Sequence, residues 1–75
     1  MALIDDLADT LARDTLALME ETGDDRLYMR VSKVIGTLSP TVEEAFLTSI
    51  RIRQAEMRGR RFLEQVAAEF RKARE

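Results

Sequence analysis

The segment from Ser39 to Glu75 most constrains the fold, because it predicts a single helix of about 35 residues. Ser39 and Pro40 form a strong start signal, since serine is a good N-cap and proline is favoured at the first helical position. No strong helix breaker follows, although Gly59 costs about 1 kcal/mol relative to alanine in mid-helix. So short a chain cannot cover both faces of this helix, so one face is expected to need a partner.

The apolar stripe of this long helix changes face halfway along. Its first half presents Val42, Phe46, Ile50 and Met57. The second half presents a second set of apolar residues on a face more than about 100° around the helix from the first. This set has heptad-like spacing, which only Glu56 interrupts. We expect the first set to pack on the rest of the chain and the second to pair with another helix. The alternatives are a helix bent onto its own hairpin and a frayed C-terminal turn. The predicted interface consists of Ile52, Gly59, Phe62, Leu63, Val66 and Phe70.

Two shorter helices are predicted before the long one. The first covers about 2–22 and stops at Gly23, the second covers about 25–36, and the third covers about 40–74. Asp24 or Asp25 is expected to cap the second helix, and Gly36 to end it. The periodicity predicts that the first helix buries Ile4, Leu7, Leu11, Thr15 and Leu18, with Ala8, Ala12 and Met19 widening the same face. It predicts that the second helix buries Leu27, Val31, Val34 and Ile35, with Tyr28 and Leu38 at the flanks.

The small size of the chain predicts an oligomer. A domain of 75 residues usually needs a staple, and this chain has neither cysteine for disulfides nor histidine for a zinc site. Self-association is the remaining common route, and symmetric dimers are its commonest form. We therefore expect one all-α domain over residues 1–75, a helical hairpin plus one long C-terminal helix, that forms a dimeric helical bundle.

Charge is divided unevenly along the chain. Residues 1–25 hold eight acids and one base, a net charge of −7, whereas residues 26–75 hold eleven bases and six acids, a net charge of +5. Glu20 and Glu21 stand near the end of the first helix, where negative charge is unfavourable. We expect them to meet Arg26 and Arg30 or the arginine ridge of the long helix. Asp9 is expected to pair locally with Arg13, four residues on.

The ridge on the long helix includes Arg51, Arg58 and Arg61. One interpretation is a phosphate-binding surface, and the other is a solvated helix face that pairs with local carboxylates. Neither a recognition helix nor aromatic stacking residues accompany the ridge. Nucleic acid is therefore the second choice of partner. With Glu20 and Glu21, these arginines form the predicted charged interaction surface.

Other chemistry has little support in the sequence. Without histidine or cysteine the usual general base and the best nucleophile are missing, so we expect no enzyme, no cofactor and no catalytic residue. The acids around Gly23 lack the spacing of an EF-hand, so no metal site is expected. The N-terminus has neither signal-peptide nor membrane-spanning character, which favours a cytoplasmic protein, and ten arginines against two lysines favour a GC-rich bacterial source.

The long helix carries a resemblance over about half the chain. Its start at Leu38-Ser39-Pro40, followed by Glu44, the run Ser49–Arg53, Leu63 and Phe70, resembles the first long helix of TraM-type quorum-sensing antiactivators. Those are small all-helical dimers that bind a LuxR-type regulator, and they continue into a second long helix. The resemblance carries no functional residue across. The residues themselves predict a small regulatory or adaptor protein that acts through helix surfaces.

Overall fold

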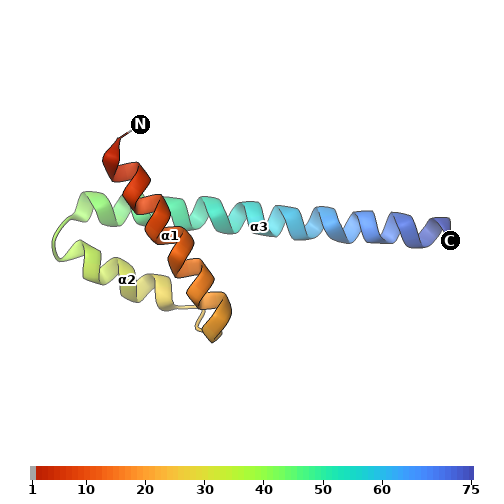
Figure 1. Cartoon of the computed structure of the whole chain (residues 1–75), viewed down its shortest axis with the longest axis horizontal. Helices are drawn as coiled ribbons and strands as arrows, with labels where there is room; N and C mark the ends of the chain where they lie inside the picture. The colour runs from red at the N-terminus through yellow and green to blue at the C-terminus, as the bar shows by residue number, and fades with distance from the viewer. Residues whose placement is uncertain (1) are drawn as a thin grey trace.

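The computed structural model describes residues 2–75, which form three α-helices. They are α1 (Leu3–Thr22), α2 (Leu27–Gly36) and α3 (Pro40–Arg74). α1 and α2 pack on the N-terminal half of α3 to form a head, and the rest of α3 projects from it as a straight arm (Figure 1). The molecule is accordingly elongated, with extents of 56 × 30 × 13 Å. The prediction of an all-α fold with a long third helix is confirmed.

Two of the four predicted helix ends follow the sequence signals. Ser39 caps α3, because its hydroxyl accepts a hydrogen bond from the Val42 amide at 3.1 Å, and Pro40 occupies the first helical position. Gly23 ends α1 in the left-handed conformation, with φ of 76°, and its amide donates to the Met19 carbonyl at 2.8 Å. Both signals are local, so they act before any tertiary packing.

The predicted cap of α2 is wrong. α2 begins at Leu27 rather than near residue 25, and its N-cap residue is Arg26, which makes no side-chain cap. The Asp24 carboxylate instead accepts a hydrogen bond from the Arg26 amide at 3.0 Å. This hydrogen bond between Asp24 and Arg26 closes a turn after Gly23. The Asp24 carboxylate therefore stabilises the turn and does not cap the helix. At the other end Gly36 is still helical and Thr37 is the C-cap.

The core of the head is built from small residues of α1 and large residues of α3. Ala8, Ala12, Phe46 and Ile50 are the fully buried apolar residues among those described. Because alanine has only a methyl group, α1 can approach α3 closely enough to enclose the Phe46 ring and the Ile50 side chain. Partly buried residues surround this centre: Leu16, Tyr28, Val31, Ile35, Ala45 and Leu47.

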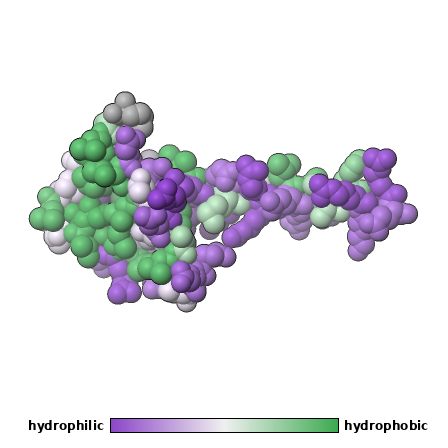
Figure 2. All heavy atoms as spheres, in the orientation of Figure 1, coloured by the Kyte–Doolittle hydropathy of each residue, from purple (hydrophilic) through white to green (hydrophobic). Residues whose placement is uncertain are grey.

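The predicted core face of α1 is partly wrong, because the alanines at its edge are buried and the leucines at its centre are not. Thr15 is buried, but Leu7 keeps 60% of its surface exposed, and Leu11 and Leu18 are also exposed. α1 carries an alanine face beside a leucine face, and the bulky Phe46 fits against the smaller one. We call the exposed residues Leu3, Leu7, Leu11 and Leu18 the leucine face. Figure 2 shows hydrophobic surface gathered over the head.

The predicted buried stripe of α2 is also partly wrong. The periodicity places Val34 in the buried stripe, yet 70% of its surface is exposed. The neighbouring Val31 and Ile35 are half-buried against the core, as predicted. α2 has only ten residues and meets the other helices along one narrow line, so Val34 at its edge stays in solvent.

Two substitutions at adjacent positions of α1 test this arrangement. Ala12→Leu is expected to lower the free energy of unfolding by about 1–3 kcal/mol, because the fully buried methyl group leaves no room for added atoms. Leu11→Ala is expected to change it by less, because Leu11 is already partly in water. Urea unfolding of both variants gives the comparison. A larger loss for Leu11→Ala would mean that the leucine face is the core face.

Candidate interaction surface

The arm, residues 58–74, is a single helix with nothing packed against most of it. Every arm residue is exposed except Ala67, which is half-buried. Phe62, Leu63 and Phe70 each keep more than 60% of their surface exposed, and Val66 keeps 42%. Hydrophobic surface is visible along the arm between charged side chains (Figure 2). α3 runs without a bend onto the hairpin and is helical as far as Arg74 (Figure 1).

The predicted interface residues lie along one side of α3, and we call them the arm stripe: Ile52, Gly59, Phe62, Leu63, Val66 and Phe70. The stripe begins at Ile52, which is 63% exposed at the root of the arm. It lies away from the face that carries the buried Phe46 and Ile50, as predicted. A Cβ added at Gly59 would meet no heavy atom within 4 Å, so no contact inside this chain requires a glycine there.

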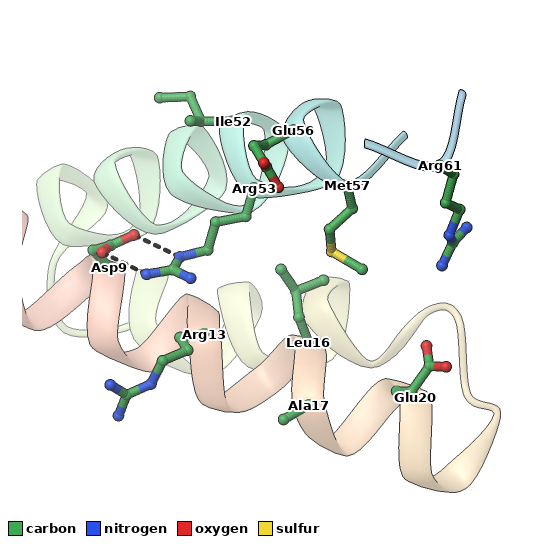
Figure 3. Close-up of a pocket in the computed structure, with 10 residues that line it drawn as sticks. All are labelled: Asp9, Arg13, Leu16, Ala17, Glu20, Ile52, Arg53, Glu56, Met57 and Arg61. Atoms are coloured by element: carbon green, nitrogen blue, oxygen red, sulfur yellow. Dashed lines mark hydrogen bonds and ion pairs between the residues drawn. The ribbon is translucent and has the colours of Figure 1, made fainter. Parts of the chain in front are cut away.

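A groove runs between α1 and α3 where the two helices diverge (Figure 3). This central groove has a volume of about 730 Å³. Leu16 and Met57 face each other across it, while Glu20 and Arg61 point toward one another from opposite sides (Figure 3). Its lining is therefore apolar in the middle and charged at the rim. The remaining residues that line it are Asp9, Arg13, Ala17, Ile52, Arg53 and Glu56.

A bidentate ion pair joins α1 to α3 at this groove. The Arg53 guanidinium donates two hydrogen bonds of 2.8 Å to the two carboxylate oxygens of Asp9 (Figure 3). These bonds lower the pKa of Asp9 below its usual value, because the guanidinium stabilises the charged carboxylate. The expected local support of Asp9 by Arg13 is weak, since Arg13 forms its ion pair with Asp14 at 3.1 Å and only its charge helps to lower the pKa of Asp9. Asp9 lies beside the buried Ala8, on the edge of α1 that meets α3. The sequence spacing of Asp9 and Arg13 does not indicate this position.

The predicted charged surface is only partly assembled. Arg51 pairs loosely with Glu44 at 3.7 Å, and Arg60 pairs with Glu56 at 2.8 Å. Within residues 2–75, Arg58 and Arg61 form no ion pair, and neither do Glu20 and Glu21. The expected pairing of the two glutamates with arginines is thus not found in the single chain; Arg30 lies 3.5 Å from Asp24 instead. Glu20 and Arg61 nevertheless line the same groove.

A second groove lies on the other side of the crossing of α1 and α3, and we call it the head groove. Its volume is about 690 Å³. Its floor is formed by small side chains of α3, Thr41, Ala45 and Thr48, and its wall by carboxylates of α1. No pattern in the sequence predicts this groove, because it depends on the angle at which α1 crosses α3. The full lining is Asp5, Asp6, Asp9, Thr41, Glu44, Ala45, Thr48, Ser49 and Ile52.

Comparison of the chain with protein-family models, with curated protein sequences and with solved structures finds no match. The resemblance of the long helix to TraM-type antiactivators therefore gains no support. None of the three helices combines the length and the apolar character that a bilayer-spanning segment requires, over residues 2–75. In the same residues, no three acidic side chains gather closely enough to hold a metal ion.

The Asp9–Arg53 pair predicts a pH dependence of stability. Because the pKa of Asp9 is lowered in the folded chain, its contribution is complete above the ordinary carboxylate pKa and is lost as the pH falls through the lowered value. Asp9→Asn should therefore lower the melting temperature at neutral pH and should flatten its decline in acid. The matched control is Asp14→Asn, which removes an exposed pair with a neighbouring residue. Equal effects of the two variants would contradict a special role for Asp9.

Proposed function

We propose that this chain is a non-enzymatic regulatory or adaptor protein that acts by protein–protein interaction through its helix surfaces, and that it forms a homodimer through the arm. The observation that carries the proposal is the unpartnered arm stripe. Four large apolar side chains on the arm, Phe62, Leu63, Val66 and Phe70, are exposed on a helix that no other element covers. Soluble proteins rarely leave such a continuous apolar surface in water unless it binds something.

The head does not need the arm for its own packing. Its buried residues on α3 end at Ile50, and its surrounding shell also precedes the arm. An apolar stripe that contributes nothing to the core has another physical use, which is contact with a second molecule. Folding and association therefore use different faces of α3, so substitutions can separate them.

Nucleic acid binding through the arginine ridge is the alternative. Arg58 and Arg61 favour it, because they form no ion pair in the part of the chain that the structure describes. Against it, Arg51, Arg53 and Arg60 are already engaged with carboxylates of the same chain. A phosphate contact would have to break those pairs, whereas an apolar contact at the stripe would leave them in place.

Light scattering over a dilution series tests the homodimer. The wild-type chain is expected to show twice its monomer mass of 8.6 kDa at micromolar concentration. Leu63→Asp should give the monomer with the helical circular dichroism of the head retained, because a charge cannot be buried unpaired in an apolar interface. Gln65→Asp, on another side of the arm, is the control and should remain dimeric. A wild-type chain that is monomeric throughout would overturn the proposal of a homodimer.

The salt dependence of binding separates the two functions. Fluorescence anisotropy with a labelled DNA duplex should show no binding by the wild-type chain at physiological salt. If the ridge were a phosphate-binding surface, affinity would fall steeply between about 50 and 200 mM salt, because counterions are released from the duplex. The dimer mass at the same two salt concentrations should change little, since apolar contacts are not screened.

A further inference from the structure

On the side of α3 that carries the arm stripe, the side chains become larger from the head to the end of the arm. At about 100° per residue, the line of the stripe runs back from Ile52 through Thr48, Ala45 and Thr41. These head positions are small, whereas the arm positions Leu63, Val66 and Phe70 are large. Thr41 and Thr48 are exposed and Ala45 is half-buried, so this side of the head is open to a second helix.

We propose that two copies pair antiparallel along the full length of α3, with the arm of each copy lying in the head groove of the other. This inference rests on the self-association proposed above and specifies its geometry. Phe70 of one copy lies against Ala45 of the other, Val66 against Thr48, and Leu63 against Ile52.

Size matching favours this register over a parallel pair. Paired residue numbers add up to about 114 or 115 throughout, so Phe70 and Val66 of one arm meet the small Ala45 and Thr48 of the other head, and Leu63 packs on Ile52 near the centre. A parallel pair would set Phe70 against Phe70 and Thr41 against Thr41, which crowds one end and leaves a gap at the other. Gly59 falls close to the two-fold axis, opposite Ala55, where the absence of a side chain lets the helices approach.

The head groove has the shape and the charge to receive the arm. Its floor of Thr41, Ala45 and Thr48 leaves about 690 Å³, and Asp5 and Asp6 stand in its wall. The last turn of α3 carries Arg71, Lys72 and Arg74. In the antiparallel pair these basic side chains attract the carboxylates of the head groove, whereas a parallel pair would bring the two basic ends of α3 together.

The flank on which the charges lie supports the same arrangement. A two-fold axis perpendicular to two antiparallel helices brings the same flank of each helix to the same side of the pair. At 100° per residue, Arg74 lies on the flank of α3 that carries Arg53, and Arg53 contacts Asp9 of α1. Arg74 of one copy therefore faces the acidic wall of the other. Its guanidinium lies 5.6 Å from the centre of the Phe70 ring, so the charge enters the groove with the ring.

Disulfide trapping tests the register, because the natural chain has no cysteine. Thr41→Cys and Ala73→Cys lie opposite each other in the proposed pair, and both positions are exposed, so the head should fold in each variant. Mixing the two variants under mild oxidation is expected to give the mixed disulfide, as read by mass spectrometry. Either variant alone should not crosslink, since like positions lie about 48 Å apart, beyond the Cα separation of about 6.8 Å that a disulfide spans.

Each other outcome overturns the register in a recognisable way. Rapid self-crosslinking of Ala73→Cys would show a parallel pair. Preferential crosslinking of Ala73→Cys with Leu7→Cys would place the arm on the leucine face. In both cases light scattering would still show a dimer, so the proposed function would stand. A monomer in light scattering without specific crosslinks would overturn both the register and the homodimer.

A charge substitution at the arm tip gives an independent test. Arg74→Glu is expected to raise the dimer dissociation constant roughly threefold to tenfold at low salt, because it turns an attraction to the acidic wall into a repulsion. Lys72→Glu makes the same change of charge on the side of α3 that faces away from the pair, and should have a smaller effect. Equal effects would contradict the contact between the arm tip and the acidic wall.

Discussion

The contact between the alanine face of α1 and the side chains of Phe46 and Ile50 is the constraint on which the rest of the structure depends. It is the only fully buried apolar centre among the residues described, and it lies where α1 crosses the first half of α3. Everything beyond that crossing has no core to join. The arm, the leucine face and both grooves are consequences of placing one small core near one end of a 35-residue helix.

The sequence predicts the helices well because their signals are local. Ser39 with Pro40 and Gly23 mark ends that the structure confirms, and the exposure of the stripe on the arm follows from periodicity. The choice between the two apolar faces of α1 could not be predicted in this way. Hydrophobicity favours the leucines, but close packing against Phe46 favours the alanines, and only the three-dimensional fit decides between them. The head groove and the Asp9–Arg53 pair were missed for the same reason, because both depend on the crossing of α1 and α3.

The division of charge along the sequence is only partly satisfied within one chain. Arg53 neutralises Asp9 at the crossing, and Arg60 neutralises Glu56 on the arm. The carboxylates of the head groove and the basic last turn of α3 lie at opposite ends of that helix, too far apart to meet within a single copy. A charge pattern of this kind favours an antiparallel over a parallel pair of chains, because only the antiparallel orientation brings oppositely charged ends together.

The arm also links helix formation to association. An isolated helix of its length is near the lower limit at which helices persist in water, because nucleation costs more than the first hydrogen bonds return. Few tertiary contacts support it beyond the head. Its backbone amides should therefore exchange with solvent far faster in a single copy than those around Phe46, and should become protected when a partner covers the stripe. If two copies pair as proposed, protein concentration would regulate the local order of half of α3, and with it the surface that is left for any other molecule.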